Sequence, residues 1–305
     1  MRHRIISHNR AEWLENRHGG IGSSEVATIL GLNRYKSPLQ LWREKRGMEP
    51  PKAENAAMRL GHRLEPVVAD EWELATGRRY IRNTAKDYIV FTDEAPWRRV
   101  SPDREFKAGK DKGILECKST MMTVDDDLLA CWYVQLQYQL GVCGYEFGSV
   151  AWLRNGRELD YQDFDFSPST FERICSAVDE FWHKNIIEGI QPDAMTDEDS
   201  RILWPSHLQG KTKEATAEII AAINTVKDCK AVMKGLEKKI EEEELKIKLA
   251  FEDAERLVVG DKTLATYRSA KDSEKFDSKA FAEAYPDLYA QYLKPVPGSR
   301  RFLIR

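Results

Sequence analysis

The sequence lacks the cysteine and histidine patterns of the common zinc and iron–sulfur sites. Its five cysteines are scattered over 305 residues without a Cys-x-x-Cys pair, and its six histidines include no His-Glu-x-x-His pattern. These absences argue against zinc knuckles, iron–sulfur clusters and a secreted disulfide framework, and they disfavour a zinc hydrolase. The cysteines are instead expected to be reduced and packed as small hydrophobic residues.

Long apolar stretches and nucleotide-binding loops are missing as well. There is no Gly-x-x-x-x-Gly-Lys-Ser/Thr loop, no long uncharged apolar span, and no apolar run after the basic segment Met1–Arg4. The sequence therefore predicts neither an NTP-driven motor, nor a membrane span, nor a signal peptide. A hydrophobic content of 42% over this length favours one large domain with an appendage, in a soluble cytoplasmic protein.

The net charge of −3 is unevenly distributed along the chain. Residues 1–60 carry 11 Lys/Arg against 6 Asp/Glu, and residues 260–305 carry 9 against 6, so the centre is strongly acidic. Basic ends around an acidic centre fit a DNA-binding rim around a metal site. An uneven surface charge without a polyanionic partner fits the same numbers equally well.

Asp103, Glu116 and Lys118 have the arrangement that a metal-dependent phosphodiesterase needs. Two carboxylates can hold a divalent cation, which neutralises charge on a phosphoryl group and activates water, while a lysine positions water or stabilises charge. On a strand, Glu116 and Lys118 share one face and Cys117 points to the other. Residues 107–113 are predicted to form a hairpin loop that returns Asp103 to Glu116. A solvated charged hairpin is the alternative, since 32% of residues are charged.

An α+β core ending near Ile190 is predicted from the order of apolar patterns. Strands are expected within residues 79–119 and on either side of an Asn155-Gly156 turn. Ser23-Ser24 is expected to cap a short helix whose N-terminus could bind phosphate. Pro66, which follows Glu65, should kink or restart its helix. The helices are expected at residues 9–18, 25–30, 37–47, 54–76, 125–142 and 167–190.

Beyond this core the pattern changes. Residues 191–212 have the composition of a linker, and residues 213–305 form the appendage. Apolar residues recur every seven positions from Ile219, and a second such series from Ala222 is apolar except at Glu243. This pattern predicts a coiled-coil helix over about Lys213–Leu257. The tail is expected to add a hairpin around Gly260-Asp261, a helix capped by Asp277 and a strand over 301–304. The apolar seam needs cover from the tail, another protomer or a partner protein.

Five motifs, taken together and in this order, resemble the phage lambda exonuclease family, and within it the YqaJ-type viral recombinases. The resemblance covers about residues 9–190. The motifs are Arg17 with Gly22-Ser23-Ser24-Glu25, Gly61 with Glu65-Pro66, Ser101-Pro102-Asp103, Glu116-Cys117-Lys118, and Gln135-Leu136-Gln137-Tyr138.

The resemblance implies a PD-(D/E)xK restriction-endonuclease-like fold, with a mixed sheet flanked by helices over residues 1–190. Asp103 and Glu116 would be metal ligands, joined by the backbone carbonyl of Cys117. The remaining roles it implies are Glu65 as a further ligand or water-orienting group, Lys118 as the catalytic lysine, Gln135 as the residue placing water or lysine, and Arg17, Ser24 and Ser23 as the 5′-phosphate site.

The predicted function is a Mg²⁺-dependent exonuclease, with Mn²⁺ as an alternative ion, that digests one strand of duplex DNA from its 5′ end without ATP. The 3′ single strand left behind implies a single-strand annealing recombinase as partner, in a bacterial host and of phage or prophage origin. The family resemblance implies a trimer. Two alternatives stay open: an endonuclease on the same core, and a DNA-binding or scaffolding protein acting through the coiled coil.

Overall fold

The computed structural model describes residues 1–49, 55–81, 88–296, 298 and 300–304. The chain divides into two compact parts, which we call unit 1 (Met1–Leu203) and unit 2 (Trp204–Arg305). The division falls inside the segment 191–212 that was expected to be a linker. Each unit is described separately below.

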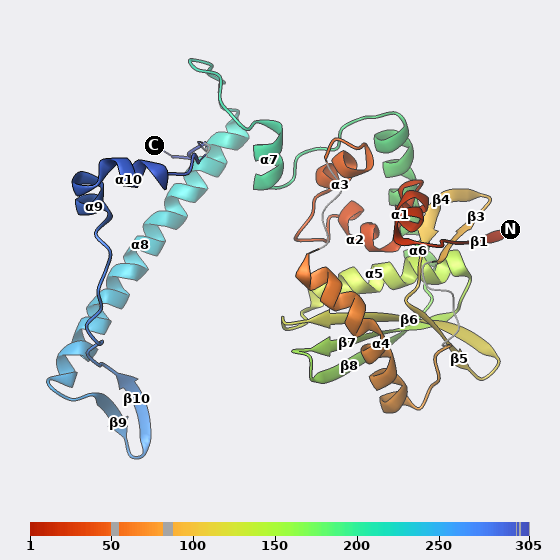
Figure 1. Ribbon diagram of the computed structural model, residues 1–305, viewed down its shortest axis with the longest axis horizontal. Helices are drawn as coiled ribbons and strands as arrows, with labels where there is room; N and C mark the ends of the chain where they lie inside the picture. Colours follow the sequence, from red (N-terminus) through yellow and green to blue (C-terminus); the bar gives the residue numbers. More distant parts are fainter. Residues whose placement is uncertain (50–54, 82–87, 297, 299, 305) are drawn as a thin grey trace. The chain divides into compact units, whose positions relative to one another are not determined.

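The centre of unit 1 is a four-stranded mixed sheet with the strand order β5-β6-β7-β8 (Figure 1). Its outer pairs are antiparallel and its central pair, β6 with β7, is parallel. A parallel pair needs a crossover, and helix α5 supplies it. The predicted α+β fold with a mixed sheet flanked by helices is therefore confirmed. The strands are β5 (Arg104–Ala108), β6 (Asp111–Thr120), β7 (Phe147–Arg154) and β8 (Glu158–Asp165).

Both predicted hairpins are present in this sheet, but one loop is shorter than expected. β5 and β6 pair up to Ala108 and Asp111, so only Gly109 and Lys110 separate them. The prediction of a loop over residues 107–113 was wrong. It was based on the polar residues of this segment, but most of them pair across the hairpin as strand residues. In the other hairpin, Asn155 and Gly156 have φ angles of 53° and 68°, as a type I′ turn requires.

A second sheet of unit 1 has the order β1-β3-β4-β2. β1 lies at its edge and pairs antiparallel with β3, while the two-residue β2 pairs parallel with β4. No strand was predicted at β1, whose sequence Arg-His-Arg-Ile-Ile starts with three basic residues and alternates between exposed and half-buried positions. The strands are β1 (Arg2–Ile6), β2 (Ile21–Gly22), β3 (Tyr88–Thr92) and β4 (Ala95–Val100).

The helices of unit 1 follow the predicted order. α4 runs through Pro66 without a break, so the expected restart of the helix there was wrong. The segment after Ser167 continues from an α-helix into a π-helix. The helices are α1 (Arg10–His18), η1 (Ser23–Glu25), α2 (Val26–Ile29), α3 (Pro38–Lys45), α4 (Ala56–Thr76), α5 (Asp126–Cys143), α6 (Pro168–Glu180), η2 (Phe181–Ile187) and α7 (Asp197–Leu203).

Helices α4 and α5 pack on opposite faces of the mixed sheet. Side chains of α4 around Trp72 bury Leu115 and Cys117 of β6. Side chains of α5 around Leu136 bury Ile114 of the same strand and Val150 of β7. Because consecutive residues of β6 contact different helices, the strand is buried on both sides.

Unit 2 is built around the 35-residue helix α8 (Ala217–Phe251) (Figure 1). The helix ends before Leu257, which lies in a strand, so the predicted end was wrong. The final strand predicted over 301–304 is absent from these four residues. The hairpin and the Asp277-capped helix are confirmed. The remaining elements are β9 (Arg256–Val259), β10 (Lys262–Thr266), α9 (Ser278–Ala284) and α10 (Pro286–Gln291).

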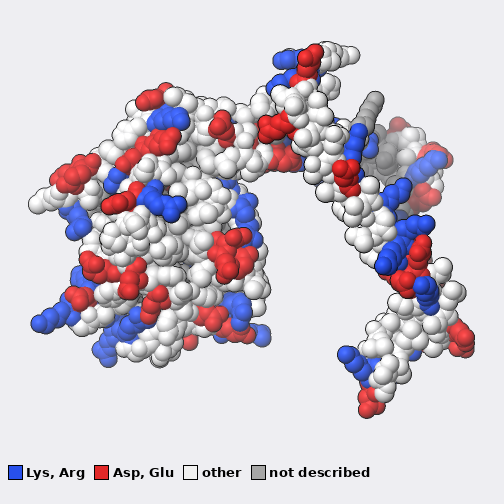
Figure 2. Space-filling model, turned by 180° about the vertical axis from the view of Figure 1, so that it is seen from behind, with Lys and Arg blue, Asp and Glu red and all other residues white. Residues whose placement is uncertain are grey.

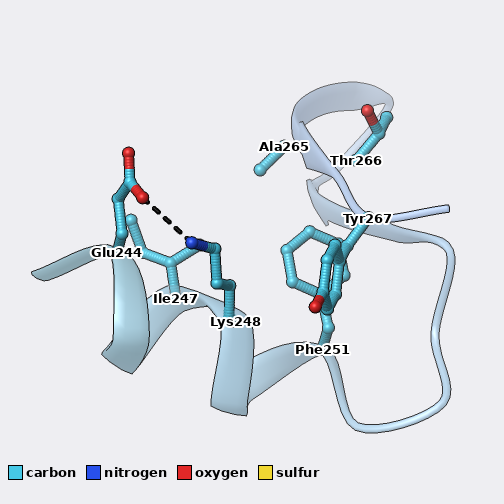
Figure 3. A pocket seen from close by; sticks show the side chains of 7 residues that line it. All are labelled: Glu244, Ile247, Lys248, Phe251, Ala265, Thr266 and Tyr267. Atoms are coloured by element: carbon cyan, nitrogen blue, oxygen red, sulfur yellow. Dashed lines mark hydrogen bonds and ion pairs between the residues drawn. The ribbon is translucent and has the colours of Figure 1, made fainter. Parts of the chain in front are cut away.

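Very little of unit 2 is buried. Every residue of α8, all of which the structure describes, is exposed except Ile223 and Phe251. Phe251 packs against Tyr267, with ring centroids 5.6 Å apart, in a small pocket beside the Glu244–Lys248 ion pair (Figure 3). The predicted cover for the heptad seam therefore stays a prediction. Over the described ranges, no helix combines the length and apolar character needed to cross a membrane.

Candidate active site

The β5–β6 hairpin brings Asp103 against the middle of β6. Asp103 directly precedes β5, and its Oδ2 accepts a hydrogen bond of 2.8 Å from the backbone N–H of Cys117. Pairing of Arg104 with Leu115 sets this register. The sequence predicted that the hairpin would return Asp103 to the Glu-x-Lys segment, and the structure confirms that proximity.

Strand alternation separates the three residues of the Glu-x-Lys segment as predicted. Cys117 packs in the apolar cluster under α4. Glu116 and Lys118 instead reach the α5 side, where Lys118 Nζ lies 2.6 Å from Glu116 Oε1. Glu116 is buried, with 2% of its surface exposed, so its charge depends on donors supplied by the protein.

Helix α5 supplies those donors from two glutamines one turn apart. Gln135 Nε2 donates to Glu116 Oε1 at 2.5 Å, and its Oε1 accepts from Lys118 Nζ at 3.0 Å. Gln139 Nε2 donates to Glu116 Oε2 at 2.8 Å. Both oxygens of the buried carboxylate are thereby fixed in place. We call Asp103, Glu116, Lys118 and Gln135 the acidic site.

The charges of the acidic site shift each other's protonation. Burial, together with the neighbouring Glu116 and Glu65 carboxylates, raises the pKa of Asp103 well above its usual value. Burial opposes the charge on Lys118, but Glu116 and Asp103 outweigh it and raise the pKa of the ammonium. Glu65, half-buried on α4, also contacts His62 Nδ1 at 2.9 Å. The site thus concentrates negative charge around one lysine.

The carboxylate oxygens of the acidic site are suitable ligands for a hard divalent cation. Within the segments that the structure describes, no three His, Cys, Asp or Glu side chains converge as a ready-made metal cluster. Mg²⁺ does not need such a cluster, because it keeps several waters and binds through one or two carboxylates. Asp103 and Glu116 provide that pair, because the Asp103 carboxylate is hydrogen-bonded to the backbone N–H of Cys117, the residue that follows Glu116.

Arg17, Ser23 and Ser24, which we call the Arg17 site, lie where α1 and η1 approach each other. Arg17 Nη2 donates to Ser24 Oγ at 2.5 Å and lies 3.8 Å from Glu25 Oε1. Glu25 is buried and pairs with Lys45 at 2.9 Å. Burial alone would raise the pKa of Glu25, but Lys45 and Arg17 lower it overall, so this carboxylate is held ionised.

The expected serine cap at this position is wrong. η1 spans only Ser23–Glu25, and neither serine caps it. The backbone N–H of Gly22 donates instead to Glu25 Oε2 at 2.7 Å. Because a carboxylate already satisfies this N–H, Gly22 does not offer it to a phosphate group, and Arg17 with the serine hydroxyls remains as the candidate phosphate-binding set. Ser24 is exposed, whereas Ser23 is buried.

Gln139, which was not among the predicted site residues, connects the two sites. Gln139 Nε2 donates to Ser23 Oγ at 3.2 Å as well as to Glu116. The spacing of Gln135 and Gln139 by one helical turn was visible in the sequence. Only the structure shows that both side chains contact the same carboxylate.

The surface of unit 1 does not present a single basic stripe on the face shown in Figure 2. Lys and Arg side chains alternate there with Asp and Glu side chains. That face therefore shows no continuous basic rim of the kind that the charge distribution suggested.

Comparison with known sequences matches this chain to a family model and to a protein of Bacillus subtilis. Residues 12–146 match the model of the YqaJ-like viral recombinase domain. The chain is also 29% identical over 309 residues to the "Uncharacterized protein YqaJ" of Bacillus subtilis (strain 168), covering 97% of this chain and 94% of that protein.

Among solved structures, the alkaline exonuclease LHK-Exo from Laribacter hongkongensis is 18% identical, with a TM-score of 0.45 over 59% of this chain and 94% of that one. A phage-related exonuclease from Haemophilus somnus 129PT is 12% identical, with a TM-score of 0.42 over 56% and 96%.

The family match spans the Arg17 site, the acidic site and both glutamines of α5, and it agrees with the order of motifs read from the sequence. The predicted resemblance to the YqaJ-type viral recombinases is therefore confirmed: residues 12–146, within unit 1, are similar to the YqaJ-like viral recombinase domain.

Proposed function

We propose that the protein is a divalent-metal-dependent exonuclease that digests one strand of duplex DNA from its 5′ end without ATP. The observation that carries this proposal is the acidic site, in which Asp103, Glu116 and Lys118 gather under Gln135 in a domain of the YqaJ-like type. Such a set of groups suits phosphodiester hydrolysis.

Asp103 and Glu116 would hold the cation, with the carbonyl of Cys117 and the Glu65 carboxylate as the further ligands that the resemblance implies. When bound, Mg²⁺ or Mn²⁺ would neutralise phosphoryl charge and activate water. Gln135 and Gln139 of α5 hold the two oxygens of the Glu116 carboxylate in a fixed orientation. Restricting its rotation reduces the reorganisation that binding would require.

Lys118 is suited to stabilising charge in this arrangement. Its pKa is raised by the neighbouring carboxylates, so the side chain is an ammonium at neutral pH. Gln135 Oε1 accepts a hydrogen bond from the ammonium group and so fixes its position. A positive charge held at that point favours the negative charge that develops as a P–O bond breaks.

End recognition is assigned to the Arg17 site. A guanidinium binds phosphate through two charge-assisted hydrogen bonds, and the Ser24 hydroxyl lies beside it. A terminal 5′-phosphate held there would place the strand end at a fixed distance from the acidic site. The direction of digestion along the strand would then be set by which strand end, 5′ or 3′, the Arg17 site holds.

The wider roles rest on the family resemblance. A 3′ single strand is the product of 5′ digestion, so a single-strand annealing recombinase is the proposed partner. A trimer, a cytoplasmic location and a phage or prophage origin are proposed on the same basis.

A cleavage assay on end-labelled DNA tests the main proposal. Linear duplex should be degraded in Mg²⁺ and stay intact in EDTA, and a covalently closed circle should be resistant. Ca²⁺ should support DNA binding with little cleavage, because its looser coordination places the attacking group poorly. Rapid cutting of the closed circle would instead favour the endonuclease alternative, and DNA binding without any cleavage would favour the scaffolding one.

The Arg17 site has its own test. Duplex with a 5′-phosphate should be digested faster than duplex with a 5′-hydroxyl, and Arg17→Ala should reduce that preference about tenfold or more, as loss of a charge-assisted bond predicts. Arg157→Ala, in the exposed turn of the β7–β8 hairpin, is the matched control. A wild-type enzyme without a phosphate preference would refute this assignment.

A further inference from the structure

We propose that Gln139 is a positioning residue that couples the Arg17 site to Glu116, so that a 5′-phosphate bound at one end tightens divalent-cation binding at the other. The inference rests on the proposed function for its two ligands. It adds a residue and a form of regulation: the enzyme would complete its metal site only on a correct strand end.

The amide group of Gln139 contacts both sites at once. Its Nε2 has two hydrogens, and these are directed to Ser23 Oγ at 3.2 Å and Glu116 Oε2 at 2.8 Å. The side chain is fully buried, with 0% exposed. Because one planar group serves both acceptors, a shift at Ser23 changes the hydrogen bond to Glu116.

The orientation of the amide is determined by its charged partner. Rotating the amide by half a turn would place Oε1 against the Glu116 carboxylate, which is electrostatically unfavourable. In the observed orientation Oε1 is buried without a hydrogen-bond partner among the described residues. Such unpaired acceptors are rare in protein interiors and are tolerated where a group serves another purpose. Gln139 is therefore held for its two donated bonds.

The other end of the connection is also well defined. Ser23 precedes Ser24, which accepts from Arg17, and both belong to the short turn η1. That turn is anchored by Glu25, whose carboxylate binds Gly22 N–H and Lys45. A phosphate that draws Arg17 and Ser24 toward itself would move the turn against this anchor, and Gln139 would transmit the change to Glu116 Oε2.

Gln137 offers a matched control on the same helix. It is also fully buried, and its amide makes two hydrogen bonds of 2.8 Å, to the carbonyl of Asp165 and from the N–H of Ser167. Neither partner belongs to the acidic site or the Arg17 site. Gln137→Met therefore removes as many buried hydrogen bonds as Gln139→Met, without touching the proposed coupling.

The experiment measures Mn²⁺ affinity by titration calorimetry on the full chain, with and without a short duplex that carries a 5′-phosphate or a 5′-hydroxyl. The linkages near that end are cleavage-resistant phosphorothioates, so that Mn²⁺ binding is measured without hydrolysis of the duplex. In wild type the phosphorylated duplex should tighten Mn²⁺ binding about fivefold or more relative to the hydroxyl duplex, the usual range of coupling between sites. Gln139→Met should weaken Mn²⁺ binding about 10- to 100-fold, as loss of a ligand-orienting partner does. It should also abolish the difference between the duplexes.

Gln137→Met should keep both the Mn²⁺ affinity and the difference between the duplexes, with thermal melting used to confirm that each variant is folded. In cleavage assays, Gln139→Met should remove the advantage of phosphorylated over hydroxyl ends, while Gln137→Met retains it. If Gln139→Met keeps wild-type coupling, or if Gln137→Met loses it equally, the inference is overturned while the nuclease proposal stands. A wild type that neither binds Mn²⁺ nor cleaves DNA overturns both.

Discussion

Two leucines with almost identical numbers show how differently the two units use the same side chain. Leu136 on α5 is fully buried between the helix and the mixed sheet, whereas Leu236 on α8 is 56% exposed. Of the buried hydrophobic side chains in the described segments, Phe251 is the one that belongs to unit 2. Apolar periodicity therefore predicts a helix in both places, but it identifies a core only where a second surface covers the helix.

Ion pairs differ between the units in the same way. Glu116 is buried, Lys118 is half-buried, and both contact Gln135, whereas Glu243 and Lys246 form an exposed pair of similar length, 2.8 Å. Removal from water strengthens an electrostatic interaction and shifts the pKa values of the groups involved. A Glu–Lys pair can serve chemistry in unit 1, while in unit 2 it contributes mainly to the helix surface.

The largest expected effect separates these two Glu–Lys pairs. Asp103→Asn, Glu116→Gln and Lys118→Met should each lower the cleavage rate by about 10²- to 10⁴-fold, the usual contribution of a positioned catalytic group. Glu243→Gln and Lys246→Met, which make the same chemical changes on α8, should leave the rate unchanged. Single-turnover cleavage of linear duplex is the measurement. Full activity in any of the first three variants would refute the two-carboxylate mechanism.

The next effect tests burial directly. Leu136→Ala should lower the free energy of unfolding by about 2–5 kcal/mol, because it removes packed methyl groups and leaves a cavity. Leu236→Ala should change it by about 0.5 kcal/mol or less, as exposed substitutions usually do. Urea denaturation of both variants decides the comparison. A large loss in Leu236→Ala, dependent on protein concentration, would show that a second copy covers α8 in solution.

The sequence predicted the mixed sheet and the grouping of Asp103 with Glu116 because strand alternation and hairpin turns are local properties. It missed β1 because an edge strand with the residues Arg2-His3-Arg4 has no apolar face. It misplaced the cap at Ser23 because it could not show that Glu25 satisfies the N–H of Gly22. Gln139 was passed over for a similar reason, since its partners lie more than twenty residues away. The roles of the site residues remain predictions.

A smaller effect concerns the boundary between the units. A chain ending after Leu203 should fold and retain metal-dependent cleavage, whereas one ending after Ile190 should lose about 1–3 kcal/mol of stability. The shorter chain lacks Asp199, which is buried and accepts from Ser37 Oγ at 2.5 Å and from the N–H groups of Met195 and Thr196.

Asp199→Ala in the full chain is the control for this boundary, because it removes the same acceptor without shortening the protein. Urea denaturation and a cleavage assay on short duplexes are the measurements. A folded chain ending at Leu203 that cleaves nothing would show that unit 2 completes the active site.

The smallest effect is a pH dependence of stability that unit 2 should not share. Glu105 of β5 is buried and pairs with Arg4 of β1 at 2.6 Å, while Tyr88 donates to the same carboxylate at 3.1 Å. Burial alone would raise the pKa of Glu105, but Arg4 and these hydrogen bonds lower it below the unfolded value. The folded state therefore binds this proton less tightly than the unfolded state does. The resulting stability is present above pH 4.5 and is lost as the pH falls toward the folded pKa.

Urea denaturation between pH 3 and pH 6 should show this loss in wild type, and Glu105→Gln should flatten the curve in that range. Glu243→Gln should leave the curve unchanged, because the exposed Glu243–Lys246 pair contributes little in either protonation state. Arg4→Met should also flatten the curve, since it removes the cation that lowers the pKa of Glu105. If Glu105→Gln kept the full acid dependence, the ion pair between Arg4 of β1 and Glu105 of the β5–β6 hairpin would not be what stabilises unit 1 in this pH range.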